Sequence, residues 1–219
     1  MPTTIAVLNQ KGGSGKTTIS TNLAYALHEE GDSVMLIDAD PQGSARDWNE
    51  ANAGELLPVV GLDRETLPKD LDAISGGYDW IVIDGTPQIA RLSAVAVRIA
   101  DLVLIPVQPS PYDIWSCADL VDIVKARQEV TEGKPKAAFI VSRAITNTKL
   151  SSEVTEALRG YHLPVLKART VQRVAYPTTA ALGRTVFDQP DSAAHKEIIS
   201  IREEVKEFVN GARSPKNSS

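Results

Sequence analysis

The sequence predicts an α/β fold, a three-layer sandwich in which helices cover both faces of a mostly parallel, twisted sheet. Short apolar runs rich in β-branched residues alternate along the chain with longer segments of helical periodicity. The runs are apolar at nearly every position, which is typical of strands buried on both faces. With 219 residues, the chain is long enough for one compact domain. We expect a single domain over residues 1–210 and a disordered polar tail at 211–219.

The strands are expected at uninterrupted apolar runs, and the helices at segments with apolar residues three or four positions apart. A strand at 3–9 leads through a glycine-rich turn to a helix at 16–31, which Gly31 ends. The other strands are expected at 33–40, 79–84, 101–107 and 136–143, with a marginal one at 163–168. The other helices are expected at about 113–132, 151–159 and 192–209.

Composition excludes several classes of protein. No apolar run is long enough to cross a membrane, and the N-terminus lacks the charged start and apolar stretch of a secretory signal. Cys117 is the only cysteine, which excludes a disulfide within the chain, and the three histidines are far apart in the sequence. These features predict a cytoplasmic protein in a reducing compartment, without a cysteine-rich metal site and without a membrane partner.

A phosphate-binding loop is predicted at residues 9–18, which read NQKGGSGKTT. The loop lies between a strand and a helix, and its glycines allow successive backbone N–H groups to point at phosphate oxygens. The start of the helix adds the positive end of its dipole. Lys16 is expected to reach the β- and γ-phosphates, and the hydroxyl of Thr17 to bind Mg²⁺. The alternative, a glycine-rich turn with chance lysines, leaves this placement between strand and helix unexplained.

One position of the loop departs from the usual pattern. The motif G-x-x-x-x-G-K-[ST] requires glycine at position 10, but Gln10 stands there and Lys11 follows it. The sequence therefore carries a second cation close to the predicted phosphates. Such a cation stabilises charge that develops during phosphoryl transfer, as an arginine finger does. A solvated surface lysine is the alternative.

Three aspartates lie at the carboxyl ends of two of the predicted strands. Asp38 and Asp40 end the second strand, and Asp84 ends the third. Because ligands of parallel α/β sheets bind beyond the carboxyl ends of the strands, we expect these acids to converge on the loop. Asp84 fits an acid that holds Mg²⁺ directly or through water, and one of the other two is expected to position the attacking water. For each acid alone, a helix cap or a turn is the alternative.

These segments resemble those of a known family. KGGSGKTT is similar to the deviant Walker A box of the ParA/MinD ATPases, LIDADPQG to their switch I, and YDWIVIDGTP to their Walker B and switch II. The similarity runs from residue 4 to about 190, and IPVQPSPYDIWSCADLV and RTVQRVAYPTTAALGRTVFD are most similar to the small plasmid-partition ATPases of the ParF type. The resemblance implies a P-loop NTPase fold, ATP and Mg²⁺ as cofactors, and slow, partner-stimulated hydrolysis of ATP to ADP and phosphate.

The resemblance also implies roles for single residues. Lys11 matches a lysine that crosses a dimer interface to the partner's nucleotide, so ATP would hold a homodimer together. Asp40 matches the water-positioning aspartate, Asp38 its companion near Mg²⁺, and Asp84 the Walker B acid. The expected catalytic residues are Lys11, Lys16 and Asp40; the nucleotide-binding residues are Lys11, Gly12, Gly13, Ser14, Gly15, Lys16, Thr17 and Thr18; the metal-binding residues are Thr17, Asp38 and Asp84.

A basic interval stands out against the net charge of −5. No acidic residue occurs between Glu156 and Asp188. Members of the resembled family bind DNA without sequence preference as ATP-bound dimers, and this interval is the candidate for such binding here. Lys167, Arg169 and Arg173 are the expected contacts to DNA phosphates. A solvated or internally paired basic surface is the alternative.

Together these features predict an ATP-dependent dimeric switch on the bacterial nucleoid, which segregates plasmid or chromosomal DNA with a small centromere-binding partner. Two alternatives stay open: a ParA-like ATPase that positions a non-DNA cargo, such as a protein cluster or a microcompartment, and a nucleotide-controlled polymer. Some relatives end in a membrane helix. Here the last helix has an apolar side opposite Glu197, Glu203, Glu204 and Glu207, and anionic lipid repels such a face. We interpret it as a helix that packs on the core.

Overall fold

The computed structural model describes residues 1–87, 90–145 and 150–211. Its centre is a six-stranded sheet in the order β3-β2-β4-β1-β5-β6, and every strand pairing in it is parallel. The strands are β1 (Thr3–Val7), β2 (Val34–Asp38), β3 (Val59–Gly61), β4 (Trp80–Asp84), β5 (Leu102–Val107) and β6 (Lys136–Val141). The predicted parallel α/β sheet is therefore confirmed.

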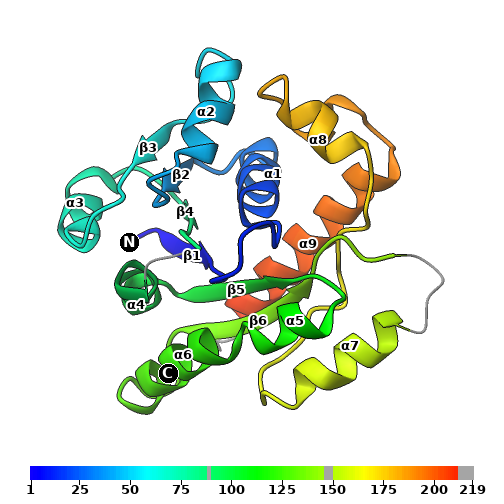
Figure 1. Cartoon of the computed structure of the whole chain (residues 1–219). Coiled ribbons are helices and arrows are strands. Elements are labelled where there is room, and N and C mark those ends of the chain that lie inside the picture. The colour runs from blue at the N-terminus through cyan, green and yellow to red at the C-terminus, as the bar shows by residue number, and fades with distance from the viewer. Residues whose placement is uncertain (88–89, 146–149, 212–219) are drawn as a thin grey trace, which may run out of the picture.

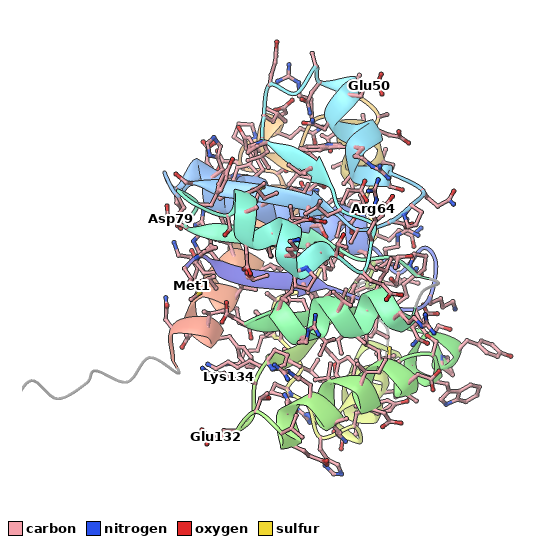
Figure 2. The ribbon with its side chains drawn as sticks, turned by 90° about the vertical axis from the view of Figure 1, so that its left-hand side faces the viewer. Met1, Glu50, Arg64, Asp79, Glu132 and Lys134 are labelled. Carbon is pink, nitrogen blue, oxygen red and sulfur yellow. The ribbon has the colours of Figure 1, made fainter. Side chains whose placement is uncertain are left out.

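Helices cover both faces of the sheet (Figure 1). They are α1 (Lys16–Glu29), α2 (Ser44–Ala51), α3 (Leu67–Ile74), α4 (Ala90–Ile99), α5 (Pro111–Trp115), α6 (Ala118–Glu129), α7 (Leu150–Arg159), α8 (Ala175–Ala180) and α9 (Ala193–Asn210), with a 3₁₀ turn, η1, at Val186–Asp188. One apolar core joins the sheet to α1, α2 and α9, and the other joins it to α3, α4, α6 and α7. Figure 2 shows the second face, with α3, α4 and α6 in front of the sheet. The arrangement forms the predicted three layers.

The C-terminal helix packs on the core as expected. Ile198, Ile201 and Val205 of α9 are fully buried against α1 and the sheet. The short strand β3 and the helices α2, α3, α4 and α8 were not among the predicted elements. The predicted tail lies outside the described residues from position 212 onward.

Two predicted elements are corrected. The segment 163–168 makes only an isolated bridge, from Val165 to Phe139 of β6. It leaves the sheet because the N–H groups of Lys167 and Ala168 donate to the carboxylate of Glu204 instead of to a strand.

The predicted helix at 113–132 is divided into α5 and α6. The carbonyl of Asp113 accepts from the side chains of Ser116 and Cys117, at 2.8 and 3.2 Å. The N–H of Cys117 accordingly bonds to Ile114, one residue closer than in an α-helix. The hydroxyl and thiol thus break the helical hydrogen-bond pattern, which periodicity alone does not reveal.

We predict that Gly183→Ala destabilises the fold strongly. Gly183 has φ +63°, and an added Cβ would lie 2.5 Å from the backbone nitrogen of Asn52. Asn52 also donates to the Gly183 carbonyl at 2.7 Å, which fixes this close approach. Gly77→Ala is the matched control, since Gly77 has φ +92° but no atom within 4 Å of its added Cβ.

Both variants carry the left-handed backbone strain, about 1–2 kcal/mol. Gly183→Ala should lower the free energy of unfolding by about 1–3 kcal/mol more than Gly77→Ala, measured by urea denaturation. Equal losses would contradict the close packing of α2 on this turn.

Candidate nucleotide-binding site

The carboxyl ends of β1, β2 and β4 bring the predicted residues to one edge of the sheet. In the strand register, Asp84 of β4 lies beside Val7 of β1 on one side and beside Asp38 of β2 on the other. The loop after β1 crosses this edge and enters α1 at Lys16. The expected convergence of the loop and the acids is therefore present.

The loop has the backbone shape that a phosphate cradle requires. Gly13 and Gly15 have φ +75° and +95°, values that glycine adopts without strain. A Cβ on Gly15 would also lie 3.3 Å from the Cβ of Ser142. The hydroxyl of Ser14 is buried and has no hydrogen-bond partner in the protein. A polar atom left in this state fits a loop that is built to receive a polar ligand.

Two side chains from other strands hold the loop in place. Gln108, after β5, donates its amide to the carbonyl of Gly13 at 2.5 Å. Ser142, after β6, donates its hydroxyl to the carbonyl of Ser14 at 2.6 Å. Sequence reasoning gave neither residue a role. Gln108 lies in the segment IPVQPSPYDIWSCADLV that resembles the family, whereas the only signal for Ser142 was its position at the end of a predicted strand.

Lys16 lies folded over the loop. Its side chain is largely buried, and Nζ donates to the carbonyl of Lys11 at 3.0 Å. Burial lowers the pKa of Lys16, whereas the nearby charges of Asp84 and Asp40 raise it. The ammonium group therefore stays close to two carboxylates and to the backbone of the loop, where an anionic ligand would bring it a further partner.

Asp84 is buried beneath the first turn of α1. Its carboxylate accepts from the hydroxyls of Thr17 at 2.7 Å and Ser20 at 3.1 Å. Burial raises the pKa of Asp84 to about 7, the hydroxyls oppose this rise, and the neighbouring Asp38 adds to it. A bound cation would relieve this cost. Thr17 and Asp84 are thus in contact with each other, as a shared role at Mg²⁺ requires.

Asp38 has a different set of contacts. It is fully buried, one oxygen accepts from the N–H of Asp40, and the other from the first N–H groups of α2, at Ala45 and Arg46. These contacts fit the helix-cap alternative, and the metal-binding role of Asp38 stays a prediction. Among residues 1–87, 90–145 and 150–211, no group of three or more His, Cys, Asp or Glu side chains is placed to hold a metal. A Mg²⁺ here would keep several waters, as is usual for that ion.

Asp40 stands on a tightly bonded turn. Its carboxylate accepts from the N–H of Gln42 at 3.0 Å, and its carbonyl accepts from the guanidinium of Arg46 at 3.0 Å. Arg46 also lies 3.5 Å from Asp38 and 3.6 Å from Asp63. Sequence reasoning missed Arg46, although it lies six residues beyond Asp40 in the same segment.

Lys11 is in contact with an acid of its own chain. Its ammonium donates to the carboxylate of Asp113 on α5 at 2.7 Å, and its N–H donates to the side chain of Asn9 at 2.9 Å. The Lys11 side chain is 39% exposed, whereas that of Asp113 is 5% exposed. Lys11 is thus partly exposed and paired within its own chain, and its role toward a partner's nucleotide stays a prediction. Sequence reasoning assigned no role to Asp113 or Asn9, although Asn9 begins the predicted loop and Asp113 lies in a segment that resembles the family.

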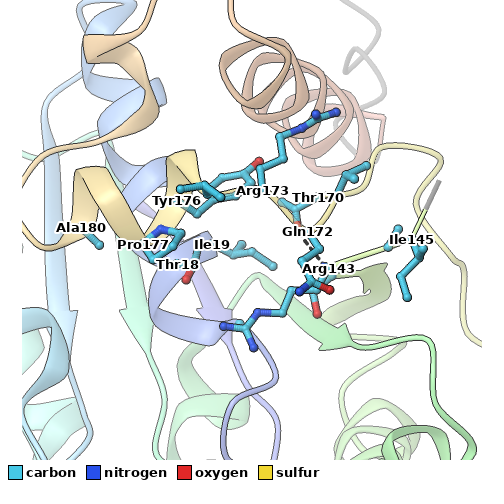
Figure 3. A pocket seen from close by; sticks show the side chains of 15 residues that line it. Thr18, Ile19, Arg143, Ile145, Thr170, Gln172, Arg173, Tyr176, Pro177 and Ala180 are labelled. Atoms are coloured by element: carbon cyan, nitrogen blue, oxygen red, sulfur yellow. Dashed lines mark hydrogen bonds between the residues drawn. The ribbon is translucent and has the colours of Figure 1, made fainter.

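A cavity of about 640 Å³ opens beside the loop. Gly15, Thr18 and Ile19 form one wall, the segment 142–145 after β6 forms another, and the segment 170–177 with Ala180 forms the third. Figure 3 shows Arg173 and Tyr176 along one side of the cavity and Arg143 along the opposite side. Thr18, a predicted nucleotide-binding residue, therefore faces this cavity.

The three predicted DNA contacts differ in their surroundings. Lys167 and Arg169 are exposed. Arg173 is half-buried, and its guanidinium lies 2.6 Å from the carboxylate of Glu197 on α9. The internally paired alternative thus describes Arg173. The side chain of the exposed Arg169 also donates to the carbonyl of Lys167, at 3.4 Å.

Comparisons with known proteins cover the region that contains this site. A family model described as the CobQ/CobB/MinD/ParA nucleotide binding domain matches residues 5–186. The maintenance of carboxysome distribution protein A of Halothiobacillus neapolitanus is 32% identical over 188 residues, covering 84% of this chain and 86% of that protein. The chromosome-partitioning ATPase Soj of Thermus thermophilus is 29% identical over 193 residues, covering 72% and 76%.

A solved structure shares the fold. The septum site-determining protein MinD of Pyrococcus horikoshii, in complex with Mg-ADP, has a TM-score of 0.73 and 18% identity, and the match covers 98% of this chain and all of MinD. The fold and the site together define a P-loop nucleotide-binding protein of the ParA/MinD class. This chain belongs to the CobQ/CobB/MinD/ParA nucleotide-binding family. The family model describes a nucleotide-binding domain, in agreement with the nucleotide ligand predicted from the sequence. The described part of the chain has no helix that is long and apolar enough to cross a membrane.

We predict that Asp84→Asn stabilises the ligand-free protein above neutral pH. Because burial raises the pKa of Asp84 from 3.8 to about 7, the folded state binds this proton more tightly than the unfolded state. The free energy of unfolding therefore falls as the pH rises from about 4 through 7. The variant lacks this loss, so it should be more stable than wild type by roughly 1–3 kcal/mol at pH 8 and by little at pH 5.

Urea denaturation at the two pH values, without nucleotide or Mg²⁺, measures the difference. A variant less stable than wild type by the same amount at both pH values would contradict the buried charge. It would mean that the hydrogen bonds from Thr17 and Ser20 dominate.

Proposed function

We propose that this protein is an ATP-hydrolysing switch of the ParA type. ATP binds with its phosphates in the loop Lys11–Thr18 and its nucleoside in the adjoining cavity. Two ATP-bound chains form a dimer, the dimer binds DNA without sequence preference, and hydrolysis releases it. The observation that carries the proposal is the loop itself. Its positive-φ glycines, buried Lys16 and unpartnered Ser14 hydroxyl support a phosphate ligand at this edge of the sheet.

The residues of the site divide the work of hydrolysis. Lys16 stabilises the phosphates, while Thr17 and Asp84 hold Mg²⁺, which neutralises phosphate charge when bound. Asp40 orients the attacking water, and the bonds from Gln42 and Arg46 fix the turn on which it stands. The contacts of Asp38 support a role in shaping that turn more than direct binding of the metal.

Lys11 supplies the second cation to the partner's nucleotide. Its partial exposure supports this role, since the side chain has access to the surface. In the single chain its ammonium bonds to Asp113, so dimerisation exchanges this contact for the partner's phosphate. A cation that arrives only in the dimer makes ATP a requirement for assembly, and loss of the γ-phosphate weakens the dimer.

The DNA surface is formed by the exposed cations of the segment 157–187. Lys167 and Arg169 are the proposed contacts, while the pairing of Arg173 with Glu197 supports a structural role for that residue. A dimer carries two such surfaces, which raises the effective affinity over that of one chain. The protein would then act in the bacterial cytoplasm, on the nucleoid.

The cargo has two candidates. Similarity to the chromosome-partitioning ATPase Soj of Thermus thermophilus supports DNA segregation. A small centromere-binding protein is the partner proposed for that role. The carboxysome distribution protein of Halothiobacillus neapolitanus aligns over more of this chain and at higher identity, 84% coverage and 32%. This similarity favours the second candidate, the positioning of a protein body by a partner that adapts it to the same switch.

The first test is retention on random-sequence DNA with ATP or with ADP, across a salt series. We expect retention with ATP alone and a steep loss of binding as salt rises, because phosphate contacts release counterions. The double variant Lys167→Ala, Arg169→Ala should bind less tightly and with a shallower salt slope. Lys134→Ala, which changes an exposed lysine outside the basic segment, should match wild type. Equal retention with both nucleotides, or none with either, would overturn DNA binding as the output of the switch.

We predict that Lys11→Ala separates nucleotide binding from dimer formation. The affinity of the single chain for ATP should change by less than about threefold, since Lys16 and the loop remain. The ATP-dependent dimer should be lost. Calorimetry measures the first and light scattering the second, with Lys134→Ala as the control. An ATP dimer of normal stability in Lys11→Ala would remove the proposed role across the interface.

A further inference from the structure

The acidic side of α9 is not a uniform solvated face. Two of its carboxylates, seven positions apart, contact the basic segment that was predicted to bind DNA. Glu204 accepts from the N–H groups of Lys167 and Ala168 at 2.9 and 2.7 Å. Glu197 accepts from the segment 171–176. The segment 167–174 has no helix and no ladder strand, so these carboxylates supply partners that secondary structure does not.

Glu197 makes a dense set of contacts. One oxygen accepts from Arg173 at Nε, 2.7 Å, and also lies 2.6 Å from a terminal nitrogen of that guanidinium. The other oxygen accepts from the N–H of Val171 at 3.1 Å and from the hydroxyl of Tyr176 at 2.8 Å. The Glu197 side chain is only 13% exposed, so water screens these charge-assisted bonds weakly.

All three partners of Glu197 line the cavity beside the phosphate loop. Val171, Arg173 and Tyr176 belong to its third wall (Figure 3), whereas Lys167 and Ala168, the partners of Glu204, do not line it. Glu197 itself is not a lining residue, so it acts on the cavity only through these neighbours. Burial raises the pKa of Tyr176, and Glu197 raises it further, which keeps the hydroxyl protonated as a donor.

We propose that Glu197 is a positioning residue for the nucleoside part of the nucleotide. It holds the backbone at Val171 and the side chains of Arg173 and Tyr176 in one arrangement, and so fixes the cavity wall before the ligand arrives. This inference rests on the proposed function, because it takes the cavity to hold the nucleoside. Pre-arranging the wall saves the ligand the entropy of ordering it. The C-terminal helix, remote from the phosphates in sequence, thereby sets the affinity for the base and ribose.

The test compares ADP with inorganic tripolyphosphate, both with Mg²⁺, by calorimetry. Tripolyphosphate has no nucleoside and reports on the phosphate loop alone. We expect Glu197→Gln to weaken ADP binding about tenfold or more and to leave tripolyphosphate binding unchanged. Tyr176→Phe keeps the ring and removes one hydrogen bond, so it should weaken ADP binding less, again without effect on tripolyphosphate.

Glu204→Gln is the matched control. It removes a carboxylate that holds the same segment from the same helix, outside the cavity, and it should bind both ligands as wild type does. If Glu197→Gln folds and binds ADP like Glu204→Gln, the positioning role is overturned and the proposed function stands. An equal loss of affinity for both ligands would also overturn it, and would mean that Glu197 stabilises the fold in general. If Glu197→Gln does not fold, the same comparison of ADP with tripolyphosphate is made on Tyr176→Phe. Weaker binding of ADP alone supports the positioning role, and unchanged binding of ADP or equal weakening of both ligands overturns it. If wild type binds neither ligand, the proposed function fails, and this inference fails with it.

Discussion

The buried carboxylate of Asp84 is the group on which the rest of the site depends. It ends β4 and accepts from Thr17 and Ser20, so it fixes the first turn of α1 against the edge of the sheet. The phosphate loop spans the gap between that turn and β1. These two hydrogen bonds therefore fix the end of the loop that enters α1. The same burial makes the ionised carboxylate unfavourable and raises its pKa. A bound cation would stabilise the ionised form, so burial favours cation binding at this carboxylate. The stability of the ligand-free protein is lower as a consequence.

The loop is shaped by the whole sheet as well as by its own glycines. Gln108 and Ser142 bond to its carbonyls from the ends of β5 and β6, and Asp113 binds Lys11 from α5. These three contacts join residues 95, 128 and 102 positions apart in the chain. A change at the far strands would thus reach the phosphates through these side chains. In the proposed cycle, Lys11 is the one member of this set that exchanges its partner.

The basic segment after β6 combines two surfaces. Its inner side forms the cavity wall that Glu197 holds, and its outer side presents Lys167 and Arg169 to solvent. In the proposed function, the first surface contacts the nucleotide and the second contacts DNA. Two acids of α9 hold this segment, which has no acidic residue of its own. Glu197 pairs with the guanidinium of Arg173, and Glu204 accepts from the backbone N–H groups of Lys167 and Ala168.

The sequence by itself determined the parallel sheet, the phosphate loop and the acids at the strand ends. These depend on local signals, because apolar runs, glycine positions and strand ends are readable within a few residues. Three contacts were decided only by the tertiary structure. Asp38 accepts from the N-terminal N–H groups of α2, and two ion pairs form, Lys11 with Asp113 and Arg173 with Glu197. The last two pairs join residues 102 and 24 positions apart. The partner of a charged side chain is the group that lies next to it in the folded chain, and this depends on how the helices pack on the sheet. Periodicity and motifs do not predict such pairs.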